Sequence, residues 1–188
     1  AATRLPAKLT ATQLKGRGLD LEAAEEAPAQ PEPSRKPWGT PQFLQDRPLT
    51  GREKGSATHL FMQFGRYESC TTREGIRQEL VRMQAEKFLT PRQAEAVDAE
   101  KILALFSSEL GNRILHADSL RREFKFSILA DAAAYDPAAV GEQVMLQGVV
   151  DCFWQEPDGI VILDFKTDYI HGDLQQKAAR YAPKLRAY

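Results

Sequence analysis

Two apolar segments near the end of the chain carry charged residues where buried strands normally have none. Asp151 lies within "LQGVVDCFW" (146–154), and Asp164 and Lys166 lie within "IVILDFKTDY" (160–169). Only "QEPDG" separates the two segments, and a Pro-Asp-Gly sequence is typical of a tight turn. The pattern predicts a β-hairpin whose strands carry two carboxylates and one ammonium group.

The turn decides which of these residues face each other. If Pro157 and Asp158 are its central pair, Asp151 lies directly opposite Asp164, and period-two alternation puts Lys166 on the same face. A longer turn with a glycine bulge would shift this register by one residue. Facing carboxylates in an apolar setting destabilise a sheet, and a divalent cation between them removes the repulsion. The hairpin therefore favours a metal site over the structural alternative, in which Asp164 simply pairs with a nearby lysine or arginine.

The segments before the hairpin have mainly helical patterns. Helices are expected over 55–64 with Ser56 as N-cap, over 72–88, from Thr90 to about 107, and in a short segment ending near 116. The "TPRQ" sequence is a strong start signal, because Thr90 can cap, Pro91 suits the first turn and Gln93 completes a capping box. Upstream, a short helix is expected near 10–18, followed by a linker over 20–41 that is rich in proline and glutamate.

Period-two alternation begins after the helices. In "SLRREFKFSIL" (119–129), Leu120, Phe124, Phe126 and Ile128 are expected on one face and Glu123 on the other. Strands over 143–154 and 160–166 and a final helix over 173–188 follow. Helices, a run of strands and a last helix predict an α/β or α+β domain with a small central sheet.

Composition excludes several classes of protein. A net charge of −1 excludes a globally basic nucleic-acid binder but permits a local basic strip. No apolar run approaches the roughly 18 residues of a membrane span, and the start has no secretion signal. Cys70 and Cys152 lie far apart, so no iron–sulfur cluster is expected from this chain. A cytoplasmic setting fits, and the uncapped end and missing initiator Met favour a fragment of a longer protein.

The order of these motifs resembles a known family. Asp151 followed by Asp164-x-Lys166 resembles the PD-(D/E)xK nuclease motif, and "GSATHLFMQ" with His59 and "RREFKF" with Glu123 resemble its RecB-type branch. The segments "LPAKLTATQLKGR" and "FLTPRQAEAVDAEKI" are similar to AddA, the helicase–nuclease subunit of AddAB (RexAB) complexes. The resemblance runs from about residue 5 to residue 188.

The resemblance implies a fold and a set of site residues. It implies a restriction-endonuclease-like α/β core with a small mixed sheet flanked by helices over 51–188, after an N-terminal arm and linker over 1–50. Mg²⁺, with Mn²⁺ as a substitute, would be held by His59, Asp151, Asp164 and the backbone carbonyl of Phe165. Lys166 would orient the attacking water and stabilise the charged phosphate, and Glu123 would lie beside the site.

The last helix carries cations and aromatic rings. Residues 175–188 contain Lys177, Arg180, Lys184 and Arg186, with Tyr181 and Tyr188 between them. Such a mixture is typical of single-strand binding, and a solvated helix face is the alternative for each cation. The family usually has Gln-x-x-x-Tyr here, whereas this chain has Lys184 in place of the Gln and keeps Tyr188.

The resemblance implies a Mg²⁺-dependent DNA nuclease that cuts single strands during recombination and double-strand break repair. No G-x-x-x-x-G-K-[ST] sequence occurs in the chain, so the helicase motor is expected elsewhere in the parent protein, beside a second subunit of the AddB/RexB type. Two alternatives remain open. One is an inactive nuclease-fold module that binds or steers DNA, and the other is a structural docking domain.

Overall fold

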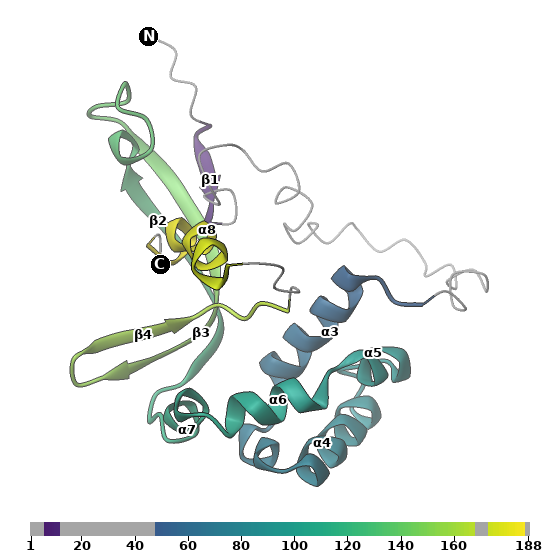
Figure 1. The fold of residues 1–188 in the computed structure, drawn as a ribbon. Coiled ribbons are helices and arrows are strands. Elements are labelled where there is room, and N and C mark those ends of the chain that lie inside the picture. Colours follow the sequence, from purple (N-terminus) through teal and green to yellow (C-terminus); the bar gives the residue numbers. More distant parts are fainter. Residues whose placement is uncertain (1–5, 12–47, 168–172, 187–188) are drawn as a thin grey trace.

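The computed structural model describes residues 6–11, 48–167 and 173–186. Figure 1 shows a group of helices beside a small, strongly twisted sheet. The helices are α3 (Gly51–Phe64), α4 (Arg73–Ala85), α5 (Pro91–Ala96), α6 (Ala99–Phe106), α7 (Glu109–Leu115) and α8 (Leu174–Arg186), with short 3-10 helices η2 (Tyr67–Thr71) and η3 (Ala132–Ala134). The strands are β1 (Lys8–Thr10), β2 (Arg121–Asp131), β3 (Gln143–Glu156) and β4 (Gly159–Leu163). The linker expected over 20–41 lies outside the described residues, as does most of the helix expected over 10–18.

Strand β3 is the centre of the sheet. Strand β2 pairs with it antiparallel along one edge, from Asp131↔Gln143 to Arg121↔Phe153. The other edge is shared, because β1 pairs parallel beside the start of β3 and β4 pairs antiparallel beside its end. The α/β class and the small mixed sheet flanked by helices are therefore confirmed. Strand β1 adds to this sheet a segment far away in sequence.

The hairpin between β3 and β4 has the predicted register. Its closing pair is Glu156↔Gly159, so Pro157 and Asp158 form the two-residue turn. The pairing extends to Cys152↔Leu163, where β4 ends. The strand expected over 160–166 was thus too long, and the chain leaves the sheet at Asp164.

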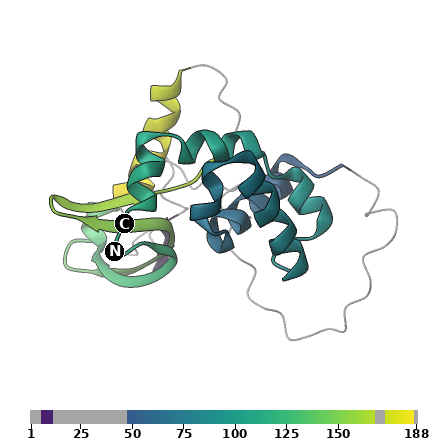
Figure 2. The same ribbon diagram turned by 90° about the horizontal axis from the view of Figure 1, so that it is seen from below.

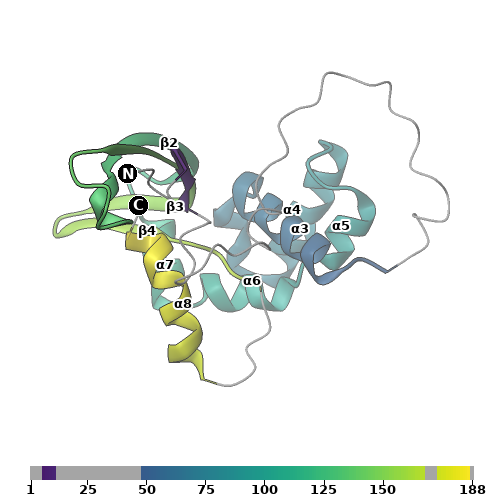
Figure 3. The same cartoon turned by 90° about the horizontal axis from the view of Figure 1, so that it is seen from above.

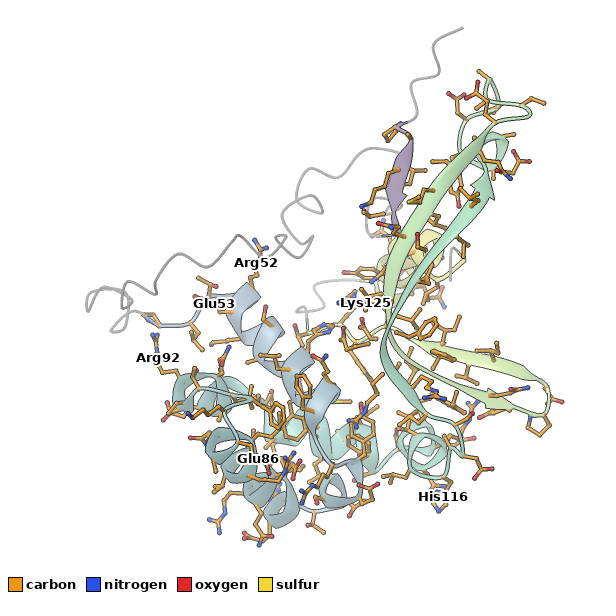
Figure 4. All side chains as sticks on the ribbon, turned by 180° about the vertical axis from the view of Figure 1, so that it is seen from behind. Arg52, Glu53, Glu86, Arg92, His116 and Lys125 are labelled. Atoms are coloured by element: carbon orange, nitrogen blue, oxygen red, sulfur yellow. The ribbon has the colours of Figure 1, made fainter. Side chains whose placement is uncertain are left out.

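Helix α3 starts earlier than the sequence indicated. Thr50, rather than Ser56, is its N-cap: the Thr50 hydroxyl accepts from the Glu53 N–H at 3.2 Å, and the Glu53 carboxylate accepts from the Thr50 N–H at 2.8 Å. Figure 4 shows Glu53 and Arg52 at this end of α3. Gly51 and Gly55 weakened the helical signal of this first stretch.

The capping box of Thr90 and Gln93 and the position of Pro91 are confirmed, but the helix that follows is shorter than expected. It ends at Ala96, and Asp98 caps a separate helix, α6, by accepting from the Lys101 N–H at 3.2 Å. An aspartate N-cap satisfies a free backbone N–H of the first turn, so the break needs no proline or glycine.

Two apolar cores hold the elements together. The larger one joins the helices to the end of β3 and includes Phe61, Ile76, Phe106, Cys152 and Trp154. Figures 2 and 3 show most of these helices gathered to one side of the sheet, and Figure 1 shows α8 apart from them, beside the sheet. None of the helices in the described segments is both long and apolar enough to cross a membrane.

The smaller core lies between β1, the first half of β3 and η3, around Leu9, Val144 and Leu146. It covers the predicted apolar face of β2 only in part. Phe126 packs against it, whereas Phe124 and Ile128 remain 48% and 50% exposed. The apolar face that the alternation in β2 predicts is therefore only partly covered by other described residues.

The lack of a side chain at Gly148 of β3 allows Phe126 of β2 and Ala11, next to β1, to pack closely against β3. A Cβ there would lie 2.6 Å from the Phe126 ring and 2.9 Å from the Ala11 Cβ. We expect Gly148→Ala to lower the free energy of unfolding by about 1–3 kcal/mol, because the ring must move out of its packing position. Gly51→Ala is the control, since a Cβ at that helix position meets nothing within 4 Å. Urea unfolding that shows equal stability for both variants would contradict the close packing at Gly148.

Candidate metal centre

Three carboxylates lie at one level of the sheet. The pairs Arg122↔Cys152 and Phe124↔Val150 flank Glu123, which places it across from Asp151. On the other side of β3, Leu163 pairs with Cys152, so Asp164 is the next residue beside Asp151. The two strands next to β3 thus bring a carboxylate to each side of Asp151.

Glu123 has an unusual backbone conformation. Its φ of 51° lies in the left-handed region, which residues other than glycine rarely adopt. Such strain persists only where the surrounding structure imposes it, and it is concentrated at functional sites. Burial, and then the Asp151 carboxylate, raise the pKa of Glu123 above its usual value. The strained residue therefore also carries a carboxylate in an unfavourable electrostatic position.

His59 from α3 completes a cluster of donor atoms. Its Nδ1 lies 3.7 Å from Asp151 Oδ2, and one donor atom each of His59, Glu123 and Asp151 lie within 4.8 Å of one another. The structure thus brings together three residues that the sequence singled out. His116, labelled in Figure 4 at the end of α7, lies apart, with its Nδ1 2.8 Å from the Asn112 carbonyl oxygen.

Asp151 is held in place although its charge is disfavoured. The backbone N–H of Phe165 donates to Asp151 Oδ2 at 2.7 Å, which fixes the carboxylate against the segment leaving β4. Burial and the nearby Asp164 carboxylate raise the pKa of Asp151, and His59, Lys184 and this hydrogen bond only partly offset them. The positive groups around Asp151 therefore do not fully compensate its charge.

Asp164 has the opposite environment. Lys184 Nζ lies 2.6 Å from its Oδ1, and Lys166 Nζ lies 2.5 Å from its Oδ2. Burial alone would raise the pKa of this carboxyl, but the two ammonium groups outweigh burial and lower it. The contact with Lys166 lacks hydrogen-bond geometry, so Asp164 Oδ2 is buried without a hydrogen-bond donor among the described residues.

These donors fit a divalent cation. A buried carboxylate oxygen without a donor, two carboxylates with raised pKa values and an imidazole would all gain from a positive charge among them. Carboxylate oxygens are the ligands that Mg²⁺ prefers, and an added imidazole also suits Mn²⁺. The Phe165 carbonyl, predicted as a further ligand, accepts from Lys166 Nζ at 3.2 Å in this structure.

Lys184 lies in the carboxylate cluster. Lys184 is 8% exposed, and its contact with Asp164 makes it a counter-ion of that carboxylate. The sequence did not indicate this role. The signal in the sequence was its position in the Gln-x-x-x-Tyr pattern of the family, where Lys184 replaces the Gln. Lys166 Nζ lies 5.3 Å from the centre of the Tyr181 ring, so this tyrosine also reaches the site.

The other residues of the expected DNA-binding helix are less fully described. The backbone of α8 is described at positions 177 and 180, but the side chains of Lys177 and Arg180 lie outside the described part, and so does Tyr188. Their contacts with DNA stay predictions.

Comparison with known proteins points to one class. Three relatives carry the name of the A-type subunit of an ATP-dependent helicase/nuclease. The protein from Acetivibrio thermocellus is 37% identical over 194 residues, which cover 100% of this chain and 15% of the relative. The protein from Pelotomaculum thermopropionicum is 39% identical over 190 residues, which cover 97% of this chain and 15% of the relative. The protein from Bacillus cereus (strain AH187) is 38% identical over 175 residues, which cover 91% of this chain and 14% of the relative. No family model matches the chain.

The chain is therefore homologous to helicase/nuclease subunits. Over nearly its whole length it is related to the A-type subunit of ATP-dependent helicase/nucleases, which confirms the resemblance to AddA found in the sequence. The chain spans about one seventh of the length of these curated relatives, or 14–15%.

The raised pKa of Asp151 predicts a specific effect of pH. Asp151→Asn keeps an acceptor for the Phe165 N–H but removes the unfavourable charge, so at pH 7 we expect the metal-free variant to be more stable by about 1–2 kcal/mol. The penalty is fully present above the raised folded pKa and disappears as the pH falls towards the unfolded value of about 4. The gain should shrink accordingly between pH 7 and pH 4, as measured by urea unfolding in EDTA. Exposed Asp118→Asn is the control, and a less stable Asp151→Asn at pH 7 would contradict this assignment.

Removal of the charge of Lys184 should lower the stability of the metal-free chain, in contrast to the change at Asp151. In Lys184→Gln, the buried Asp164 loses one of its two ammonium partners, so we expect the metal-free chain to lose about 1–3 kcal/mol of stability. Lys87→Gln removes the same charge from an exposed position and should be nearly neutral. Thermal melts in EDTA compare the two, and equal melting temperatures would show that Lys184 is not a counter-ion of Asp164.

Proposed function

We propose that the chain is a metal-dependent nuclease domain that hydrolyses phosphodiester bonds of single-stranded DNA. The observation that carries this proposal is the cluster of His59, Glu123 and Asp151, next to Asp164 and Lys166 on the segment leaving β4. The relatives are named as helicase/nuclease subunits, which is consistent with this activity.

The metal would supply the central chemistry. Held by His59, Asp151, Asp164 and the Phe165 carbonyl, with Glu123 directly or through water, Mg²⁺ or Mn²⁺ would polarise the phosphate and make a bound water more acidic. Asp164 Oδ2 is buried without a hydrogen bond from a described residue, although the Lys166 ammonium lies 2.5 Å away, so this oxygen would bind the metal beside that ion pair.

Lys166 is the residue that would act on the phosphate. Its side chain is 28% exposed, so the ammonium group can reach a substrate while it stays 2.5 Å from Asp164 Oδ2. A fixed cation at this place would orient the attacking water and stabilise the negative charge of the transition state. The Tyr181 ring next to it limits the positions of the lysine.

The fold fits this proposal. A mixed sheet with the acidic residues of a hairpin at its centre supports the restriction-endonuclease-like, PD-(D/E)xK assignment. We propose that residues 51–188 are the nuclease core and that residues 1–50 are an arm and linker. Lys8–Thr10 of this arm contributes β1 to the core sheet.

The wider setting follows from the relatives. A helicase motor would occupy another part of the parent chain, since this segment covers 14–15% of its relatives. A second subunit of the AddB/RexB type, cytoplasmic location and a role in recombination and double-strand break repair belong to the same proposal. Lys177, Arg180, Tyr181, Lys184 and Tyr188 on the last helix are the proposed DNA contacts, with Lys184 first having to leave Asp164.

Cleavage of a 5′-labelled single strand tests the proposal. We expect cutting with Mg²⁺ or Mn²⁺, none in EDTA, and none by Asp164→Asn. Lys166→Ala should cut at least about a hundredfold more slowly, because an electrostatic donor is lost in the transition state, while its affinity for DNA in EDTA stays nearly unchanged. Arg77→Ala, which removes an exposed cation of α4, is the control.

Two outcomes would contradict the proposal. Metal-dependent DNA binding without cleavage by the wild type would favour the inactive module that only binds or steers DNA. Equal losses of affinity and cleavage in Lys166→Ala would make this lysine a phosphate anchor rather than a catalytic residue.

A further inference from the structure

A cavity of about 660 Å³ lies next to the metal centre. It is lined by residues of α3, α6 and α7, by Ala96 and Asp98 at the junction of α5 and α6, and by the segment Leu163–Thr167 that leaves β4. This volume lies within the roughly 300–1,000 Å³ of pockets that hold small organic ligands. The cavity is therefore large enough for one nucleotide unit.

Large apolar side chains form part of the cavity lining, and we call this part its floor. They are Met62, Ile102, Leu105, Leu110, Leu163 and Phe165. Phe165 offers an aromatic ring, and Ile102 and Met62 are each 3% exposed and belong to the main core. A flat, uncharged ligand group would displace water from these side chains, and an aromatic ring would stack on a planar base.

Three of the charged side chains that line the cavity are cationic, and we call the charged part of the lining its rim. These are Lys54, Lys101 and Lys166, and among the described residues the carboxylates in the lining are Asp98 and Asp164. Asp164 is neutralised by its two lysines, and Asp98 caps α6 with one oxygen while the other lies 3.8 Å from Lys101 Nζ. Lys54 is exposed and makes no ion pair with another described residue. The rim thus attracts an anion rather than a cation.

The cavity continues into the metal centre. Asp164 and Lys166 belong to both, and Thr58, which lines the cavity, precedes His59 on α3. Gly55 allows this approach, since a Cβ there would lie 2.9 Å from Thr167 Oγ1. A ligand in the cavity would therefore adjoin a phosphate bound at the metal.

We propose that this cavity binds the base of the nucleotide adjacent to the bond that is cut, with the next phosphate on Lys54 and Lys101 of the rim. The inference rests on the proposed nuclease function and adds to it that the enzyme holds one base in a pocket. An apolar floor with a cationic rim binds any base and its backbone, so the pocket recognises a nucleotide rather than a sequence. Duplex DNA cannot present an unstacked base there, which gives a physical reason for a preference for single strands.

Two variants test the pocket without touching the metal ligands. Gly51 lines the cavity, and a Cβ there meets nothing within 4 Å, so Gly51→Trp adds a side chain that starts from open space and would occupy part of the cavity. Lys54→Ala removes one cation of the rim, and Arg77→Ala removes an exposed cation of α4 as its matched control. Melting temperatures in EDTA establish that all three variants fold.

The substrates are single-stranded oligonucleotides, intact or with one abasic nucleotide at successive positions. For the wild type with Mg²⁺, we expect kcat/KM for the bond beside the abasic position to fall about tenfold, the scale of one lost stacking contact. Gly51→Trp should cut intact and abasic substrates equally slowly. Lys54→Ala should lower the salt slope of binding by about 0.7, as expected for one phosphate contact, and Arg77→Ala should leave it unchanged.

Binding of the same oligonucleotides in EDTA separates this inference from the proposed function. If the wild type does not cleave but prefers the intact strand, and Gly51→Trp loses that preference, the nuclease proposal fails and the pocket stands. If the wild type cleaves or binds intact and abasic strands equally at every position, or Gly51→Trp keeps the preference, the pocket inference is overturned.

Discussion

The structure depends on an unbalanced group of charges at the centre of its sheet. Glu123, Asp151 and Asp164 lie side by side on adjacent segments, and both described ammonium groups of the cluster contact the same carboxylate, Asp164. Glu123 and Asp151 are left with raised pKa values, although the Phe165 N–H donates to Asp151 and His59 lies beside both carboxylates. Buried carboxylates that are only partly compensated destabilise a fold, and a divalent cation among these donors would relieve that cost.

The rest of the fold serves to assemble this group. The larger core anchors α3, and with it His59, against the end of β3 that carries Asp151. Arg122, the neighbour of Glu123, donates to the carbonyls of Met62 and Gly65 at 3.2 and 2.7 Å and so ties β2 to the end of the same helix. Helix α8 adds Lys184 and Tyr181 from the other side. Four separate segments must therefore fold before the site exists, which couples stability to the charges of the site.

Local signals predicted much of this structure, and long-range packing decided the rest. The Pro-Asp-Gly sequence predicted a turn with two alternative registers, and the structure has the two-residue turn that places Asp164 beside Asp151. The start of α3 was missed because two glycines masked a capping box, and the break before α6 was missed because Asp98 is a common surface residue. Neither the strained backbone of Glu123 nor the burial of Lys184 could be predicted, since both arise from contacts between distant segments.

Direct measurement of metal binding is the most immediate test of the central claim. The metal-free chain should be titrated with Mn²⁺, and the free ion should be followed by its electron paramagnetic resonance signal, beside His59→Ala, Asp151→Asn and Asp118→Asn as a control. The account predicts that the wild type and Asp118→Asn bind Mn²⁺ in the same way, and that His59→Ala and Asp151→Asn each bind it at least about tenfold more weakly, on the scale of one lost ligand or charge. Absence of binding by the wild type at millimolar Mn²⁺, or equal binding by all four proteins, would contradict it.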